Sequence, residues 1–269
     1  MTSPPKNSLP IDGLAVCYTT FNSMNTLLQS LEAAKQLSSR IVAVDSGSTD
    51  GTLELLKEHG ITAKHRDWTN PTEQKRFAMS LCKDAQWTLL LDSDETILPE
   101  LSASIRSCVA NASSDCAGFE LNRMTWLDGK PLRHAFQPEW RLRLVRSNLC
   151  IIESDLSGTH DHLELTSGIC KRLRGILRHD SWIDAEDMLL RGVHWGANTG
   201  RSSGKGGHIH NLCFNPGLSF LKQLLFKRAL LDGWRGWVGA SGVASQTLAK
   251  HIAIMEKRGK QQESDREAK

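Results

Sequence analysis

The 269-residue sequence lacks several features that would assign it to a class at once. It has no apolar run of about 18 residues, which excludes a conventional transmembrane helix. Its first ten residues, MTSPPKNSLP, lack the charged and then apolar layout of a signal peptide and predict a flexible lead-in. A net charge of +3 is too small to indicate nucleic acid as a partner. The length of 269 residues is enough for one large domain, or a domain with a helical appendix, and the 39% of hydrophobic residues allows a sizeable core.

Paired cysteines and a phosphate-binding loop are also missing. The seven cysteines are scattered without a C-x-x-C motif, which favours reduced thiols in a cytoplasmic protein over disulfides or a zinc site. The stretch GRSSGKGG (200–207) is one residue shorter than a P-loop, and its lysine is followed by glycine. It therefore predicts a flexible loop.

The first hundred residues alternate strand and helix patterns. Apolar strand-like runs lie at 15–20, 41–45, 61–65 and 87–92. The segments between them have leucines at helical spacing, or Pro, Thr and Glu in a first turn. This alternation is typical of a parallel sheet covered on both faces, in which ligands bind at the carboxyl ends of the strands.

The pattern changes after residue 110. GFELNRMTWL and EWRLRLVR alternate like antiparallel strands. From Gly217 to about Gly259 the sequence becomes helical again, and the last ten residues predict a charged, frayed tail.

Three of the predicted strands end in acids, hydroxyls or amides: YTTFN, VDSGSTDG and LLLDSDE. The last has two carboxylates one residue apart, which can face one point and supply the oxygen ligands that Mg²⁺ or Mn²⁺ prefers. An acidic surface turn is the alternative for such a pair alone. Three polar strand ends in one sheet favour a metal and phosphate site.

The ordered motifs TTFN, VDSGSTDGT, QKRFAMSL and LLLDSDE resemble the family 2 inverting glycosyltransferases of the GT-A fold. The later segments PEWRLRLVR, GTHDHLE, LRHDSWIDAEDML and SFLKQLLFKRALLDGWRGWVGA are similar to the lipopolysaccharide inner-core glucosyltransferase-like subgroup. The resemblance covers roughly residues 12 to 258. It implies an α/β fold with a Rossmann-like, mostly parallel sheet flanked by helices, and a C-terminal helical extension.

The resemblance also implies a domain plan and an activity. After a lead-in at 1–11, residues 12–110 would bind the nucleotide-sugar and 111–210 the acceptor. Residues 211–259 would form helices facing a membrane, and 260–269 the tail. The expected reaction moves a hexose, with glucose the first expectation, from a UDP-sugar to a glycan or glycolipid such as lipopolysaccharide core.

For the donor, the resemblance implies that Thr20 and Asn22 form the edge of the uracil pocket and that Asp45 holds the base. Two hydroxyls would line the diphosphate and two basic residues would reach it: Ser46, Ser48, Lys75 and Arg76. The alternative for the two basic residues is a solvated helix face. Ser46 stands where many relatives have a second Asp.

For the metal, Asp94 would be the direct ligand, and Asp92 would meet the ribose or the metal shell. His160 would complete the shell or steady the diphosphate, with His179 as the next choice. Structural roles are the alternative for both histidines.

An inverting transfer needs a carboxylate that takes the proton of the acceptor hydroxyl. The sequence favours Glu139, although the subgroup usually has Asp there. Asp155 and Asp161 are alternatives, as is a structural Glu139 paired with Arg141 or Arg143.

Residues 218–237 mix leucines and tryptophans with four basic residues: Lys222, Lys227, Arg228 and Arg235. This mixture predicts an interfacial helix on an anionic membrane, with an ordinary packed helix as the alternative. The expected location is the cytoplasm, peripheral on the inner face of the cell membrane.

Two other functions compete with glycosyl transfer. A nucleotidyltransferase would need a glycine-rich basic loop near the N-terminus, where YTTFN offers none. A sugar-nucleotide-binding protein would retain the donor residues but need no base.

Overall fold

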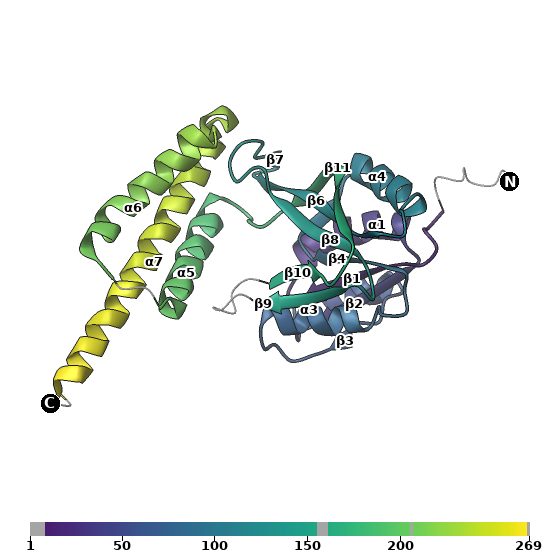
Figure 1. The fold of residues 1–269 in the computed structure, drawn as a ribbon, viewed down its shortest axis with the longest axis horizontal. Coiled ribbons are helices and arrows are strands. Elements are labelled where there is room, and N and C mark those ends of the chain that lie inside the picture. The colour runs from purple at the N-terminus through teal and green to yellow at the C-terminus, as the bar shows by residue number, and fades with distance from the viewer. Residues whose placement is uncertain (1–8, 155–160, 205–206, 268–269) are drawn as a thin grey trace. The chain divides into compact units, whose positions relative to one another are not determined.

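A computed structural model describes residues 9–154, 161–204 and 207–267, which fall into two compact units (Figure 1). The sheet unit comprises the chain up to Arg123 together with Glu139–Asp180. The helical unit comprises Met124–Pro138 together with the chain from Ser181 onward. The units therefore divide at residue 180, earlier than the expected boundary at 210, because a long helix already begins at Ala185.

The N-terminal half of the sheet is parallel and follows the order β3-β2-β1-β4. Its strands are β1 (Leu14–Thr20), β2 (Arg40–Asp45), β3 (Lys64–His65) and β4 (Trp87–Asp92). The connecting helices are α1 (Met24–Leu37), α2 (Thr52–Glu58) and α3 (Pro71–Ser80). The register pairs Thr20 with Asp45 and Thr19 with Asp92, so the polar ends of three strands meet at one edge. This confirms the α/β class and the shared carboxyl edge.

The sheet continues through β8, β6, β11 and β5, with antiparallel pairing of β4 with β8, β8 with β6 and β11 with β5. These elements are β5 (Glu95–Ile97), α4 (Pro99–Ala110), β6 (Cys116–Leu127), β8 (Trp140–Arg146) and β11 (Ile169–His179). The short β7 (Lys130–Pro131) pairs with β6, and β9 (Cys150–Ser154) forms a separate hairpin with β10 (Asp161–Leu165). The antiparallel strands expected after residue 110 are thus present.

Two apolar layers, one on each face of the sheet, pack the sheet against the elements that cover it. Alternate residues of β1 point to opposite faces, so Val16 and Tyr18 pack with α1, α2 and α4, whereas Ala15 and Cys17 pack with α3 and the β9–β10 hairpin. Both faces of β1 and β4 are buried, which explains their nearly unbroken apolar sequences, whereas the edge strand β3 is exposed.

The helical unit contains α5 (Ala185–Ser202), α6 (Ile209–Leu221), the π-helical turn η2 (Lys222–Phe226), the 3₁₀ turn η3 (Ala229–Asp232) and α7 (Trp234–Glu267). In α5, a Cβ at Gly196 or Gly200 would collide with the backbone carbonyls of Gln246 or Lys250 in α7, so these glycines allow close packing. The loop expected at 200–207 is helical to Ser202, and the expected frayed tail is helical to Glu267. Residues 218–237 span the end of α6, η2, η3 and the start of α7 rather than one helix.

Side chains from 227–235 hold the backbone of the loop that joins β6 to β8. Asp232 accepts hydrogen bonds of 2.8–2.9 Å from three consecutive backbone N–H groups at 133–135. Arg235 donates to the Leu127 carbonyl at 3.1 Å, and Lys227 donates to the Gln137 carbonyl at 2.9 Å. Two of the four basic residues expected on a membrane are therefore bound to this loop.

Candidate active site

Asp45 ends β2 and organises the loop that follows it. Its carboxylate accepts hydrogen bonds from the Thr20 hydroxyl (2.7 Å), the Ser48 hydroxyl (2.6 Å) and the backbone N–H groups of Gly47 (2.9 Å) and Ser48 (2.8 Å). Burial alone would raise the pKa of Asp45, but these hydrogen bonds, led by those of Ser48, lower it. The ionised carboxylate is fully engaged by the protein, so a nucleobase would bind it by displacing one of these donors.

The neighbouring loop after β1 is tied to the same segment. The backbone N–H of Asn22, which has a positive φ of 47°, donates to the Ser48 hydroxyl at 2.9 Å. The Asn22 side-chain oxygen accepts from the Thr49 N–H at 2.9 Å. The backbone N–H of Ser46 donates to the Thr20 carbonyl at 3.1 Å. The five residues expected around the base and diphosphate thus form one cluster, while their roles in binding remain predictions.

Asp92, the last residue of β4, lies between two cations. One carboxylate oxygen is 2.6 Å from the Lys75 ammonium, and the other is 2.6 Å from the Arg143 guanidinium. Burial opposes ionisation of Asp92, but these two charges outweigh it and hold its pKa well below the usual range. Lys75 is buried, so the solvated helix face is wrong for this residue. The Arg76 guanidinium instead binds Glu73 (2.6 Å) and the Ile152 carbonyl (2.8 Å).

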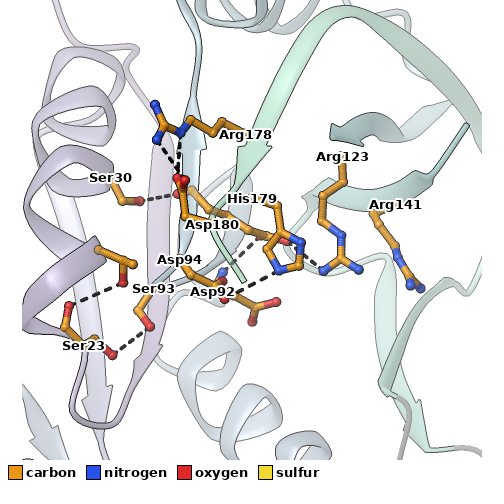
Figure 2. A network of polar contacts seen from close by, with 12 residues as sticks. Ser23, Ser30, Asp92, Ser93, Asp94, Arg123, Arg141, Arg178, His179 and Asp180 are labelled. Carbon is orange, nitrogen blue, oxygen red and sulfur yellow. Dashed lines mark hydrogen bonds and ion pairs between the residues drawn. The ribbon is translucent and has the colours of Figure 1, made fainter. Parts of the chain in front are cut away.

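Asp94 lies in the turn after β4, beside the end of β11 (Figure 2). One of its oxygens is 3.5 Å from the His179 imidazole, and the other is buried without a hydrogen-bond partner among the described residues. Burial tends to raise the pKa of Asp94, but the charge and hydrogen bond of His179 lower it. The strand register explains the pairing, because His179 is opposite Glu95 in the β11–β5 ladder and the Asp180 N–H donates to the Asp94 carbonyl at 2.9 Å.

The structure thus brings His179, the second choice of the sequence analysis, to the acid turn. His160 lies outside the described residues. Within the described part of the chain, no group of three or more Asp, Glu, His or Cys residues is arranged to hold a metal. One unpartnered carboxylate oxygen and one imidazole nevertheless fit a cation such as Mg²⁺ or Mn²⁺, which takes much of its shell from water and substrate phosphates.

Glu139 directly precedes β8 and is held by two arginines. Its carboxylate is 2.5 Å from the Arg123 guanidinium and 2.8 Å from that of Arg141. Burial opposes ionisation, but the hydrogen bonds and charges of Arg123 and Arg141 lower the pKa of Glu139 to about 2. This geometry matches the structural alternative, and a carboxylate with so low a pKa is a weak proton acceptor. Asp155 lies outside the described residues, and Asp161 is the first residue of β10.

Comparison with known proteins shows which family the sheet unit resembles. The family model described as glycosyl transferase family 2 matches residues 15–142, which include both strand-end clusters and Glu139. The chain carries a family 2 glycosyltransferase domain. It is therefore an enzyme of the glycosyltransferase class, and the α/β sheet with its polar carboxyl edge is the part that defines it.

Relatives of this glycosyltransferase extend beyond the family domain. A lipopolysaccharide core biosynthesis glycosyltransferase, LpsC, of Rhizobium meliloti is 27% identical over 248 residues, which cover 87% of this chain and 85% of the relative. An uncharacterized glycosyltransferase of Rickettsia typhi is 24% identical over 230 residues, which cover 81% and 78%. A crystal structure of S. aureus TarS has 12% sequence identity and a TM-score of 0.41, with 91% of each chain covered.

The glycosyltransferase site also contains residues that the sequence analysis did not select. Glu95 and Arg123 had no expected role, and Arg143 appeared only as an alternative partner for Glu139. Together with the expected residues they form a chain of alternating charge: Lys75, Asp92, Arg143, Glu95, Arg123, Glu139 and Arg141. The alternation R-x-R in β8 was the available signal, since residues two apart on a strand point to the same face.

Proposed function

We propose that this glycosyltransferase moves a hexose, with glucose the first candidate, from a UDP-sugar to a saccharide acceptor with inversion at the anomeric carbon. We propose also that it requires Mg²⁺ or Mn²⁺. The observation that supports the metal requirement is the second oxygen of Asp94, which is buried without a partner beside His179 at the polar edge of the sheet. A buried carboxylate oxygen without a partner is costly, and a cation would relieve that cost.

Asp94 and His179 would hold the cation, which when bound would neutralise the diphosphate leaving group. The chain's own residues would do the rest of the positioning. Thr20, Asn22 and Asp45 form the cluster proposed for the uracil end. Lys75 would act mainly on Asp92 rather than directly on the diphosphate, because its ammonium already lies 2.6 Å from that carboxylate.

Glu139 remains the proposed base, but its ion pairs with Arg123 and Arg141 restrict when it can accept a proton. An acceptor hydroxyl can give its proton to Glu139 only if Arg123 or Arg141 yields one of the carboxylate oxygens. The diphosphate is a competing anion for these arginines, since guanidinium binds phosphate as readily as carboxylate. Binding of the donor would then raise the pKa of Glu139 and make it a better base.

The proposed acceptor is a glycan or glycolipid of the lipopolysaccharide-core type. Its support is the relative named for lipopolysaccharide core biosynthesis, which aligns with most of this chain. A lipid-linked acceptor would place the enzyme, as a peripheral protein, on the cytoplasmic face of an anionic membrane.

The helical unit has a surface that suits such a membrane. On α6 and η2 a row of apolar side chains at helical spacing is exposed: Phe214 (67%), Leu218 (62%), Leu221 (46%), Leu225 (53%) and Phe226 (85%). Between 188 and 255 the sequence has eight Lys or Arg and a single acid, Asp232, which is bound to the loop. Within the described residues, none of the helices is long and apolar enough to cross a membrane. The unit would thus lie on the bilayer surface.

Flotation with anionic vesicles tests this partner. Lys222 and Arg228 are exposed, and replacing both with Gln should weaken binding by about 2 kcal/mol, at roughly 1 kcal/mol per basic residue. Replacing Lys57 and Lys83, two exposed lysines of the sheet unit, is the matched control and should leave binding unchanged. Equal flotation of all three proteins would contradict the membrane surface.

Release of UDP from a panel of UDP-sugars, with and without Mn²⁺, tests the activity itself. Transfer to a saccharide acceptor, with the anomeric configuration of the product read by NMR, separates this enzyme from its two rivals. A nucleotidyltransferase would release no UDP from a UDP-sugar and would instead form pyrophosphate from UTP and a sugar phosphate, whereas a binding protein would do neither.

A further inference from the structure

Glu95 is the most enclosed acid of the site, with no exposed surface. One of its carboxylate oxygens lies 2.6 Å from the Arg143 guanidinium and 3.4 Å from that of Arg123. The other accepts a 3.1 Å hydrogen bond from the backbone N–H of Asp92. A single carboxylate thus contacts two arginines and the backbone of the acid turn.

The backbone of Glu95 is also held by hydrogen bonds. Its carbonyl accepts a hydrogen bond from the Ser30 hydroxyl of α1. Its strand, β5, is paired with β11, where His179 is its direct partner. Glu95 is therefore held by elements from distant parts of the sequence, and its carboxylate has a defined position relative to both arginines.

The two arginines carry this placement outward to the site. Arg143 joins Glu95 to Asp92, and Arg123 joins Glu95 to Glu139. Each arginine is shared by two acids, so loss of Glu95 would leave both guanidinium groups one anion short in a buried setting. They would then turn more fully to Asp92 and Glu139, or to any anion that enters.

We infer that Glu95 is the positioning residue of this site. Its carboxylate sets the positions of Arg143 and Arg123, and through them the orientation of Asp92 and Glu139. Its negative charge also offsets the two arginines, which keeps the site receptive to a cation as well as to a diphosphate. Glu95 contacts neither substrate in this role, and the inference rests on the metal-dependent transfer proposed above.

The test compares Glu95→Gln, Glu95→Asp and a control, Glu120→Gln. Glu120 makes an ion pair with the exposed Arg172, so its replacement removes the same charge from the same unit outside the alternating chain. Calorimetry without metal should show UDP binding to Glu95→Gln about 3- to 10-fold tighter than wild type, because the site has gained net positive charge. The Mn²⁺ concentration for half-maximal turnover should rise by a similar factor, and kcat should fall at least about tenfold.

Opposite shifts in nucleotide and metal affinity would not follow from simple disruption, which weakens both. Glu95→Asp retains the charge but withdraws the carboxylate by one methylene. It should bind metal-free UDP within about twofold of wild type while kcat falls about tenfold. This variant decides the question if Glu95→Gln fails to fold. Wild-type turnover of either folded variant, or parallel weakening of UDP and Mn²⁺ by Glu95→Gln, would overturn the inference.

A ligand-free measurement separates this inference from the proposed donor. The Nε–H signals of Arg123 and Arg143 in NMR spectra should shift in both Glu95 variants and stay unchanged in Glu120→Gln. If wild type binds no UDP yet these signals shift, the proposed donor is wrong and the positioning role stands. If the signals do not shift, Glu95 does not position the arginines, whatever the donor.

Discussion

Replacement of Glu139 by Gln should make the free energy of unfolding less dependent on pH in the acidic range. In the folded protein the pKa of Glu139 is about 2, against 4.5 for an ordinary Glu, because Arg123 and Arg141 favour the ionised form. A lowering of this size corresponds to up to about 3 kcal/mol of stability, at about 1.4 kcal/mol per pKa unit. The side chain is only 20% exposed, so solvent screens the interaction weakly.

The sign follows from the direction of the shift. A lowered folded-state pKa stabilises the protein fully at pH values above 4.5, and this stabilisation is lost as the pH falls toward 2. About 1 kcal/mol should be gone by pH 4 and most of it by pH 3. Glu139→Gln should therefore unfold at lower urea than wild type at pH 7, and the two should converge as the pH falls.

Urea unfolding at pH 7, 5, 4 and 3 measures this difference. Glu120→Gln is the control, since its exposed ion pair should contribute less than about 1 kcal/mol at any of these pH values. A stability difference between Glu139→Gln and wild type that stays constant from pH 7 to pH 3 would refute the ion pairing of the Glu139 carboxylate with the two arginines.

The same variant tests the base, because loss of a general base lowers kcat by about 10²- to 10⁴-fold with donor affinity nearly unchanged. Partial activity of Glu139→Asp would agree with a base, whereas a wild-type rate for Glu139→Gln would move the search to Asp155 and Asp161.

Three further variants test the donor and metal sites. Asp94→Ala should abolish metal-dependent turnover with an unchanged melting temperature, and full activity with Mg²⁺ or Mn²⁺ would contradict its role as ligand. His179→Ala should raise the Mn²⁺ concentration for half-maximal turnover about tenfold, a change absent if the imidazole only caps Asp94. Asp45→Ala should weaken UDP binding in calorimetry, because both loops around it lose their common anchor; unchanged affinity would show that uracil binds elsewhere.

The parallel half of the fold and its polar edge could be predicted from sequence, because β1, β2 and β4 are short apolar runs that end in acids or hydroxyls. Strand direction alone then places Thr20, Asp45 and Asp92 at one edge. Side-chain pairing could not be predicted in the same way. A lysine in a helix, such as Lys75, is usually expected at the surface. Only the packing of α3 against β1 and β4 shows that it is buried beside Asp92.

The arginine contacts were even harder to predict from the sequence. Arg123 and Glu139 are 16 residues apart, and their pairing depends on the register of β6 with β8 across a bulge near Phe119. His179 reaches Asp94 through the β11–β5 ladder, which joins segments more than 80 residues apart. The exposed apolar row of α6 is visible in the sequence only as a hydrophobic helix, because periodicity does not reveal which face another helix covers.

The course of the chain through the helical unit limits how this enzyme can be cut apart. Its segment 124–138 runs from the end of β6 to just before β8, yet the acid that binds three of its N–H groups, Asp232, comes from nearly one hundred residues later. A truncation after Asp180 would leave those N–H groups without their acceptor, in the segment that leads directly into Glu139. Loss of activity on removing the C-terminal helices would consequently say nothing about membranes or acceptors. Point substitutions on the outer face of α6 are the way to separate them.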